Sequence, residues 1–362
     1  MNLDEVKPKP MGDVHGSPEN IKLKDFRPVS AFKTAQTTIP KSKFPVIDMH
    51  THAWQSSTNI HEWVKTMEAA NVEKSIVLSF ETGPAFDEMM HRFADYPDKF
   101  DIWCGLDYTG YNDTGANWTD HAIAELERCY KLGAKGVGEL GDKGLGEYYS
   151  RSVAGYGMHL NDVRMQPLLK KCGSLGLPVS VHIADPIWMY LPMNEQNDGL
   201  MNAYNWRIDI NREGILNHSQ LMDTFEDAVR QNPDTVFIAC HLLNCSHDLE
   251  ILGRMLDHYS NLNADITSRL KEVATVPRYA KAFFEKYQDR LLYGSDAGYD
   301  RGHTFDFSNQ IYQASFRLLE SADEHIYEHE LFKYHWPLYG LALSDGVLKK
   351  LYHDNAIKLF NP

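Results

Sequence analysis

The run Pro45-Val46-Ile47-Asp48-Met49-His50 (PVIDMH, residues 45–50) decides how the fold is interpreted, because it is short and mostly apolar and ends in a histidine. Similar runs recur along the chain at KSIVLS (74–79), DIWCGLD (101–107), AKGVGEL (134–140), LPVSVHI (177–183), TVFIACH (235–241), LNADI (262–266) and RLLYGSD (290–296). Strands of a parallel sheet are buried on both faces and appear in sequence as near-continuous apolar runs. The sequence therefore predicts eight parallel strands.

A segment of helical period follows each predicted strand. These segments lie near residues 60–71, 85–96, 118–132, 161–175, 219–231, 246–259, 278–287 and 305–319. Strands that alternate with helices indicate repeated βα units, and eight such units form a (β/α)8 TIM barrel of roughly 250 residues. The chain has 362 residues, so we predict an α/β fold, a TIM barrel with an N-terminal extension and extra C-terminal helices.

The segments outside the repeated units set the domain boundaries. Residues 1–44 are rich in Lys, Pro, Asp and Ser and lack periodicity, so we interpret them as an N-terminal arm that wraps the barrel or reaches a partner subunit. Residues 45–362 form the predicted barrel domain, within which 323–360 are interpreted as extra helices. The longest loop, 184–218, follows the fifth strand and is expected to overhang the active-site face.

The composition argues against several classes of function. The chain has 50 acidic and 36 basic residues and a net charge of −14, which argues against nucleic acid and anionic membranes as partners. No apolar run approaches the roughly 18 residues that span a bilayer, and the N-terminus has no apolar signal core. Five cysteines without a CxxC pair argue against a disulfide framework or a zinc finger. We expect a cytoplasmic protein, or the mature form of an exported one, that acts on a small molecule and is compatible with a homo-oligomer.

Histidines and carboxylates stand at the ends of the predicted strands. His50 and His52 form an H-x-H pair, and because strand side chains alternate, both imidazoles point the same way. The C-terminal ends of barrel strands converge on one rim, and charged groups in apolar strands are costly unless they are paired or metal-bound. The set predicts a metal centre at that rim, although each residue alone would be an ordinary buried polar group. The other strand ends that belong to this set carry Glu139, His182, His241 and Asp296.

The motifs VIDMHTH, VSVHIAD, IACH and LLYGSD, in this order from about residue 45 to the C-terminus, resemble those of the metal-dependent hydrolase (amidohydrolase) superfamily. The similarity is greatest to the amidohydrolase-related branch that includes aminocarboxymuconate semialdehyde decarboxylase and sugar-acid lactonases. The resemblance implies that His241 either binds a second metal or acts as an acid/base. It also implies a set of metal ligands, namely His50, His52, His182 and Asp296.

Glu139 bears on the number of metal ions. Superfamily members with two metals bridge them by a carboxylated lysine or a glutamate from the fourth strand. The decarboxylase subgroup typically uses one metal and does not need this residue. The resemblance therefore implies either two metals or a ligand role for Glu139 in a one-metal site.

Two other motifs in the sequence are set aside. GVGELG fits G-x-G-x-x-G through Gly136, Gly138 and Gly141, but no helix opens at the third glycine, so we reject a dinucleotide site. His325 and His329 fit H-x-x-E-H. Because their segment is charged and terminal, we interpret it as a solvated helix face.

The predicted ligands suggest a cofactor and a mechanism. Imidazole and carboxylate ligands suit zinc, manganese or iron, and we expect zinc first, with one or two ions per chain. An open coordination position lowers the pKa of bound water to about 7, and Asp296 is placed to accept its remaining proton. His241, or His182 if it is not a ligand, can stabilise the developing oxyanion or protonate the leaving group.

Three residues are candidates for substrate binding. Arg269, after the seventh strand, can clamp a substrate carboxylate in a bidentate way, and Arg207 in the loop after the fifth strand is a second candidate. A structural or surface ion pair is an equally good interpretation of each arginine. Trp54 can form a pocket wall, and with Trp188 and Trp206 it suggests a ring-shaped substrate, although large aromatics also simply pack.

Three functions remain after these considerations. The first is hydrolysis of a C–N or C–O bond in an amide, cyclic amide, ester or lactone by a metal-activated water, which Glu139 favours. The second is metal-dependent non-oxidative decarboxylation of an unsaturated or aromatic acid, since both reactions use one barrel and similar ligands. The third is a non-catalytic binding protein on a barrel scaffold, against which the complete ligand set argues.

Overall fold

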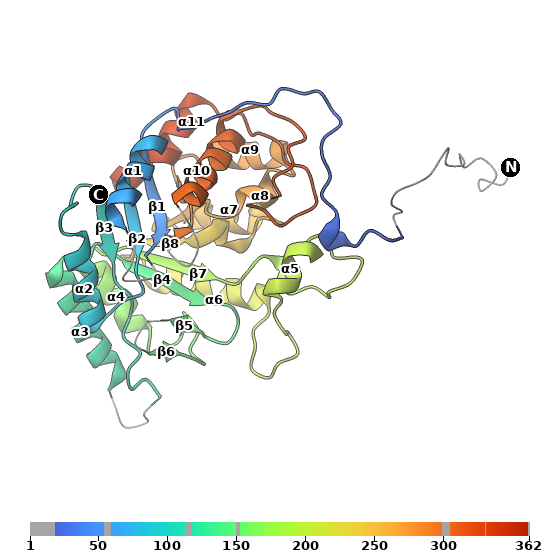
Figure 1. Cartoon of the computed structure of the whole chain (residues 1–362). Helices are drawn as coiled ribbons and strands as arrows, with labels where there is room; N and C mark the ends of the chain where they lie inside the picture. The colour runs from blue at the N-terminus through green and yellow to red at the C-terminus, as the bar shows by residue number, and fades with distance from the viewer. Residues whose placement is uncertain are drawn as a thin grey trace.

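The computed structural model describes residues 19–53, 59–112, 117–149, 153–298, 305–329 and 331–360. Its parallel strands form two sheets (Figure 1). The first sheet has the order β11 (Ala297–Gly298), β1 (Val46–His52), β2 (Val72–Leu78) and β3 (Phe100–Trp103). The second has the order β10 (Leu291–Leu292), β9 (Leu262–Asp265), β8 (Phe237–Ala239), β7 (Val179–Ile183) and β4 (Val137–Asp142).

Backbone pairing at two seams closes these sheets into one barrel. A parallel bridge between Cys104 and Val137 joins the end of β3 to β4. At the other seam the chain passes from β10 into β11, which pairs with β1 through Thr51 and Ala297. The amide of Met49 also donates to the carbonyl of Tyr293 at 2.9 Å. The predicted α/β barrel is confirmed.

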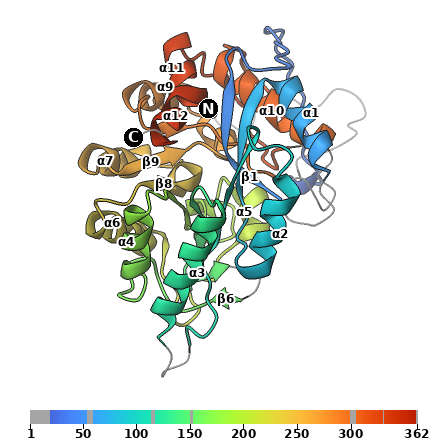
Figure 2. The ribbon, with the colours of Figure 1, turned by 90° about the vertical axis from the view of Figure 1, so that its left-hand side faces the viewer.

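A helix follows each barrel strand and covers its outer side (Figures 1 and 2). Local sequence explains the helix ends, since Asn59 caps α1 by accepting from the amide of Glu62, and Asn217 forms a capping box with Gln220 at α6. Each lies where the sequence predicts a helix: α1 (Ile60–Ala70), α2 (Gly83–Phe93), α3 (Trp118–Leu132), α4 (Gln166–Ser174), α6 (His218–Gln231), α7 (Leu249–His258), α9 (Pro277–Lys286) and α10 (Phe305–Glu320).

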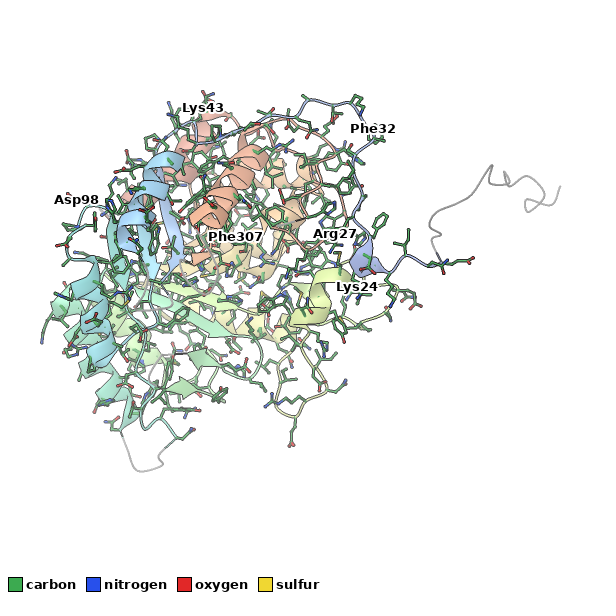
Figure 3. All side chains as sticks on the ribbon, viewed as in Figure 1. Lys24, Arg27, Phe32, Lys43, Asp98 and Phe307 are labelled. Atoms are coloured by element: carbon green, nitrogen blue, oxygen red, sulfur yellow. The ribbon has the colours of Figure 1, made fainter. Side chains whose placement is uncertain are left out.

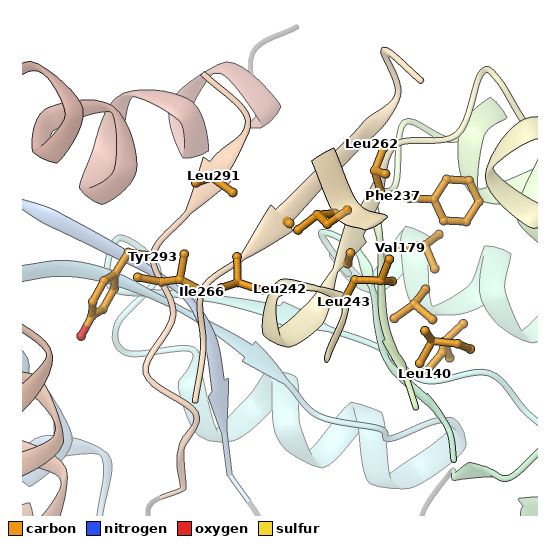
Figure 4. Close-up of a cluster of buried hydrophobic side chains, with 14 of the residues drawn as sticks. Leu140, Val179, Phe237, Leu242, Leu243, Leu262, Ile266, Leu291 and Tyr293 are labelled. Atoms are coloured by element: carbon orange, nitrogen blue, oxygen red, sulfur yellow. The ribbon is translucent and has the colours of Figure 1, made fainter. Parts of the chain in front are cut away.

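The core has an inner and an outer part. Between strands and helices, buried side chains such as Leu140, Val179, Phe237 and Leu262 pack together (Figure 4). Inside the barrel, a separate cluster fills the end opposite the rim that carries His50 and His52, and α12 (Asn355–Phe360) packs against it. The members of this inner cluster are Ile47, Met49, Ile76, Leu78, Trp103, Ile238, Leu292 and Ala356.

Strand β1 changes its register where it leaves this apolar cluster. Its pairing with β2 shifts between Asp48 and Thr51, and such an irregularity re-aims the side chains that follow. Met49 therefore packs in the barrel interior, while His50 and His52 reach the rim above it, with ring centroids 5.0 Å apart.

Residues 19–44 run along the outside of the molecule, with one short turn, η2 (Leu23–Asp25). Phe32 and Lys43 mark their course in Figure 3. Thr37 attaches this segment to the C-terminal part of the chain, because its amide and hydroxyl donate to the carboxylate of Asp323 at 2.6 and 2.7 Å. This segment, which we call the arm, is thus tied to the C-terminal part of the chain.

The prediction of helices over 323–360 is only partly right. Helical structure appears in α11 (Asp345–Lys349), in the π-helical turn η5 (Lys350–Asp354) and in α12, whereas the described residues of 321–344 contain none. Pro337 disfavours a helix there, and Ile326 pairs with Leu338 in an antiparallel bridge instead.

The interpretation of His325 and His329 as a helix face is also wrong. His325 has a left-handed backbone, with φ 58°, and its Nδ1 lies 3.1 Å from the hydroxyl oxygen of Ser30. Nε2 of His329 donates to the carbonyl of Pro28 at 2.7 Å. Both histidines therefore hold the arm.

The connections on the active-site side carry short elements. After β4 come the hairpin strands β5 (Tyr148–Tyr149) and β6 (Ala154–Gly155), and the long loop after β7 contains η3 (Ile187–Met189) and α5 (Leu200–Trp206). The turn η4 (Cys240–Asn244) follows β8, and α8 (Leu270–Val273) follows β9. Among the described residues, no helix has both the length and the apolar character needed to cross a bilayer.

Candidate metal centre

The predicted ligands converge on one rim of the barrel, as parallel strands require. His50 and His52 come from β1, and Glu139 and His182 come from β4 and β7. The remaining two predicted ligands lie in connections just beyond the strands, His241 in η4 and Asp296 between β10 and β11. Residues that are far apart in the sequence therefore share one site.

His50, His52 and Glu139 form a first group whose ligand atoms all lie within 4.8 Å of one another. Nε2 of His50 is 3.6 Å from Oε1 of Glu139, and Nε2 of His52 is 3.8 Å from Oε2. Oδ1 of Asp296 lies beside both imidazoles, 3.7 Å from Nε2 of His50 and 3.3 Å from Nε2 of His52.

Glu139 also belongs to a second group with His182 and His241. Its Oε1 is 2.9 Å from Nδ1 of His182 and 3.1 Å from Nε2 of His241, and those two nitrogens are 3.1 Å apart. One carboxylate is thus shared by two groups of potential ligands.

In three of the four histidines, a hydrogen-bond partner on the far side of the imidazole fixes which nitrogen faces the centre. Nδ1 of His50 lies 2.9 Å from Oδ2 of Asp265, and Nδ1 of His52 lies 3.0 Å from the carbonyl of Leu78. Nδ1 of His241 lies 3.1 Å from a backbone carbonyl, that of Thr267. A proton on each Nδ1 leaves the Nε2 lone pair directed into the site, which is the usual arrangement of metal-binding histidines.

One buried nitrogen and the charge of the site both point to a cation. Nε2 of His50 is fully buried and has no hydrogen-bond partner, which is costly unless something else binds it. Burial lowers the pKa of His50, but Glu139 and Asp265 outweigh it and raise that pKa to about 10. Glu139 likewise outweighs burial and raises the pKa of His182 to about 9. The carboxylates therefore attract positive charge, and these nitrogen and oxygen donors fit a divalent metal ion.

Residues 47–361 match the family model described as amidohydrolase. The chain belongs to the amidohydrolase family. Its fold also resembles solved structures. An uncharacterised TIM-barrel protein of Bordetella bronchiseptica gives a TM-score of 0.55 at 14% identity, over 88% of this chain and 99% of the other. For 2,6-dihydroxybenzoate decarboxylase from Rhizobium the TM-score is 0.53 at 13% identity, over 88% and 99%. At these identities the likeness shows the fold alone. No curated protein is significantly similar in sequence.

The backbone of this amidohydrolase is left-handed at two of the site residues. His241 and Asp296 each have a φ of 60°, and the positive values continue from His241 to Asn244. The Asn244 side chain holds this turn by donating to the carbonyls of Ile183 and Ala184 at 3.1 and 3.0 Å. Left-handed non-glycine residues cost roughly 1–3 kcal/mol each and occur often at functional sites.

Asp296 is the most exposed of the charged groups in the centre. Its side chain is 33% exposed, whereas those of His50 and Glu139 are 0% and 9% exposed. Ser268 donates to its Oδ2 at 2.7 Å. Burial raises the pKa of Asp296, but the hydrogen bond from His52 and the nearby imidazoles outweigh it and hold that pKa well below its usual range. Asp296 is therefore an ionised carboxylate that is accessible from outside.

Sequence reasoning missed the partners that orient the histidines. Asp265 holds His50, and Asp185 lies 3.3 Å from Nε2 of His182. Lys143 in turn places Nζ 3.0 Å from Oδ2 of Asp185. The only sequence signals are the acidic residues in LNAD and VHIAD. They show that the strand ends are polar but not which histidines these residues contact.

A third group of potential ligands lies deeper, formed by His50, Cys240 and Asp265. Both oxygens of Asp265 are already engaged, since Oδ2 faces His50 and Oδ1 accepts from the amides of His241 and Thr267 at 2.8 and 3.1 Å. Burial raises the pKa of the Cys240 thiol well above its usual range. This group therefore orients the imidazoles and is a poor metal site.

The predicted substrate-binding residues lie in different places. Arg269 is buried and places Nη1 2.9 Å from Oε1 of Glu272. Arg207 donates to the carbonyl of Tyr204 at 2.6 Å and lines a separate cavity with residues 190–193 and 208–211. Trp54 falls outside the described residues. Substrate contacts by these three residues stay predictions.

A cavity of about 300 Å³ adjoins the centre at Asp296. Its polar lining residues besides Asp296 are Ser268, Lys271, Ser295, Asn202, Ser315 and Lys333. Its apolar walls come from α5, α8, α10 and the C-terminal segment, through Trp206, Leu270, Phe307, Ile311, Leu331 and Phe332. This volume is at the small end of ligand pockets.

Proposed function

We propose that this protein is a metal-dependent hydrolase that cleaves a C–N or C–O bond of a small molecule, in an amide, cyclic amide, ester or lactone. The observation that carries the proposal is the position of Glu139 between two groups of histidines. A shared carboxylate supports a centre with two ions, zinc first and manganese or iron next. Its proposed ligands are His50, His52, Glu139, His182, His241 and Asp296.

Bound metal supplies a water of near-neutral pKa and polarises the carbonyl of the substrate. Asp296 is the proposed proton acceptor, because it is ionised and borders the cavity. The hydroxyl of Ser268 fixes its orientation. His241 is neutral, since burial and the neighbouring His182 lower its pKa. Its Nε2 is therefore free to act as a ligand, or to act on the substrate oxygen or leaving group.

The second candidate is non-oxidative decarboxylation, which releases CO2 and places a proton on the carbon left behind. The fold similarity to 2,6-dihydroxybenzoate decarboxylase is the observation that favours it. In a one-ion site His241 would not be needed as a ligand, and its imidazole would be available to deliver that proton. The two candidates therefore differ in the metal count.

Elemental analysis of protein purified without chelators tests the proposal, with wild type, Glu139→Gln and Asp323→Asn measured side by side. Asp323 is a suitable control because it is a buried carboxylate at the arm, away from the centre. Near two ions in wild type and the control, falling to one or none in Glu139→Gln, supports the hydrolase. Near one ion in all three favours the decarboxylase, and no metal in any of them rejects both.

A further inference from the structure

We propose that Lys271 is an anion-binding residue of the cavity beside Asp296, so that the substrate is a small molecule with a carboxylate on an apolar body. This inference rests on the proposed function, because the metal centre defines which end of the ligand reacts. It adds the chemical class of the substrate to that function.

The first support is the position of Lys271. It lies in α8, directly after β9, and lines the same cavity as Asp296 and Ser268. A ligand in this cavity would therefore contact the proposed proton acceptor and the ammonium of Lys271 together. The small volume of about 300 Å³ restricts the ligand to a small molecule.

The second support is the lack of a partner for this lysine. Lys271 is half-buried, and no carboxylate of the described residues lies within ion-pair distance of its Nζ. Burial lowers the pKa of Lys271, although the carboxylate of Glu272 partly opposes the effect. A partly buried ammonium without a carboxylate in direct contact is costly, and an anionic ligand would reduce that cost.

Two neighbouring cations, Arg269 and Lys143, differ from Lys271 in this respect, whereas Lys333, which also lines the cavity, is exposed to solvent. Arg269 is paired with Glu272 at 2.9 Å, and Oε1 of Glu272 also accepts from the hydroxyl of Tyr334 at 3.0 Å. Lys143 is paired with Asp185 at 3.0 Å. Of Lys143, Arg269 and Lys271, only Lys271 has no ion-pair partner among the described residues.

The remaining walls describe the rest of the ligand. Trp206, Phe307 and Phe332 offer aromatic surface, and Leu270 and Ile311 add aliphatic surface. The cavity therefore suits a ligand with an apolar body. Benzoate has this character, and benzamide is its neutral counterpart of nearly the same shape.

Calorimetric titration of the metal-loaded protein with benzoate and with benzamide tests the inference. Wild type is expected to prefer benzoate, and Lys271→Met is expected to bind benzoate about 10–100-fold more weakly, as for loss of a hydrogen bond to a charged group. Benzamide binding should change little. Lys271→Arg should keep the preference for benzoate. Lys281→Met is the matched control, because Lys281 is a half-buried lysine whose Nζ donates to the carbonyl of Ala342.

Metal content and circular dichroism show whether each variant is folded, and Lys271→Gln replaces Lys271→Met if the latter is not. Equal benzoate binding by wild type and a folded neutral variant overturns the inference, as does no preference for benzoate in wild type. If the purified protein holds no metal but Lys271→Met still removes its preference for benzoate, the proposed function is rejected while the anion site is supported. The two failures are therefore distinguishable.

Discussion

Oδ2 of Asp265 lies 2.9 Å from Nδ1 of His50, on the side of the imidazole that faces away from Glu139. The other oxygen of the same carboxylate accepts from the backbone amide of His241 at 2.8 Å. Asp265 therefore orients one histidine from each of the two groups that share Glu139. A single carboxylate outside the proposed ligand set therefore contacts a residue of each group.

Asp265→Asn is expected to lower metal affinity about 10–100-fold while the fold is kept, as is usual when a group that orients a ligand is lost. The amide cannot accept from His50 and from both backbone amides as the carboxylate does. Competition with a chromogenic chelator measures the affinity, with Asp323→Asn as control. Wild-type affinity in Asp265→Asn would show that Asp265 does not set the tautomer of His50.

His52→Ala is expected to lower the metal content and abolish turnover, because Nε2 of His52 faces both Glu139 and Asp296. Metal analysis and hydrolysis of p-nitrophenyl acetate, used as a general ester probe, check this. His61→Ala is the matched control, since His61 is an exposed histidine of α1. Full metal content in His52→Ala would remove this residue from the ligand set.

Asp296→Asn is expected to lower kcat by about 100- to 10,000-fold even where metal is retained, because a positioned base contributes about that much. Ser268→Ala, which removes only the hydrogen bond to Oδ2 of Asp296, should cause a smaller loss. Turnover of the same ester is the measurement, normalised to metal content. An active, metal-loaded Asp296→Asn would eliminate Asp296 as the proton acceptor.

Metal removal is expected to destabilise the protein, because the ligands are buried carboxylates and imidazoles that a cation neutralises. Binding that is restricted to the folded state adds about 4 kcal/mol when free metal is at 1,000 times its Kd. Scanning calorimetry before and after dialysis against EDTA measures the change in Tm, and added zinc should reverse it. An unchanged Tm in protein shown to have lost its metal would contradict this expectation.

His218 gives a pH dependence that is separate from the metal centre. It is buried, and its Nε2 lies 3.2 Å from the carbonyl of Asn244. Burial lowers the pKa of His218, so the folded protein resists a proton that the unfolded chain takes up below about pH 6.5. Its stability contribution is complete above that pH and is lost as the pH falls, by at most about 1.4 kcal/mol per pH unit.

Urea unfolding at pH 7.5 and 5.5 with saturating metal tests this effect in wild type and His218→Gln. The variant does not titrate at this position, so its stability relative to wild type should improve towards pH 5.5. His61→Gln, at an exposed histidine of α1, is the matched control. A stability difference between His218→Gln and wild type that is independent of pH would refute the assignment.

Much of the fold was predictable because a parallel barrel imposes simple patterns on the sequence. Strands such as β1 and β7 are buried along nearly all of their length, and the helices between them keep their caps and periodicity. The C-terminal segment was less predictable. Pairings such as that of Ile326 with Leu338, and of His329 with the arm, depend on tertiary neighbours.

The same distinction holds for the candidate site. The convergence of His50, Glu139 and His241 followed from their places at strand ends. The roles of Asp265 and Lys271 did not follow, because each depends on which atom of a side chain meets which neighbour. Glu272 shows why, since it pairs with Arg269 rather than with the adjacent Lys271.

The seam between β1 and the segment 291–298 has a consequence for how the protein is made. His50 and His52 are synthesised early, whereas Asp296 follows only with the last strand segment of the barrel. The amide of Asp296 reaches the carbonyl of His50 only when that seam has formed. A nascent chain on the ribosome therefore lacks part of the proposed donor set until residue 296 has emerged, so the proposed metal centre can be completed only late in synthesis.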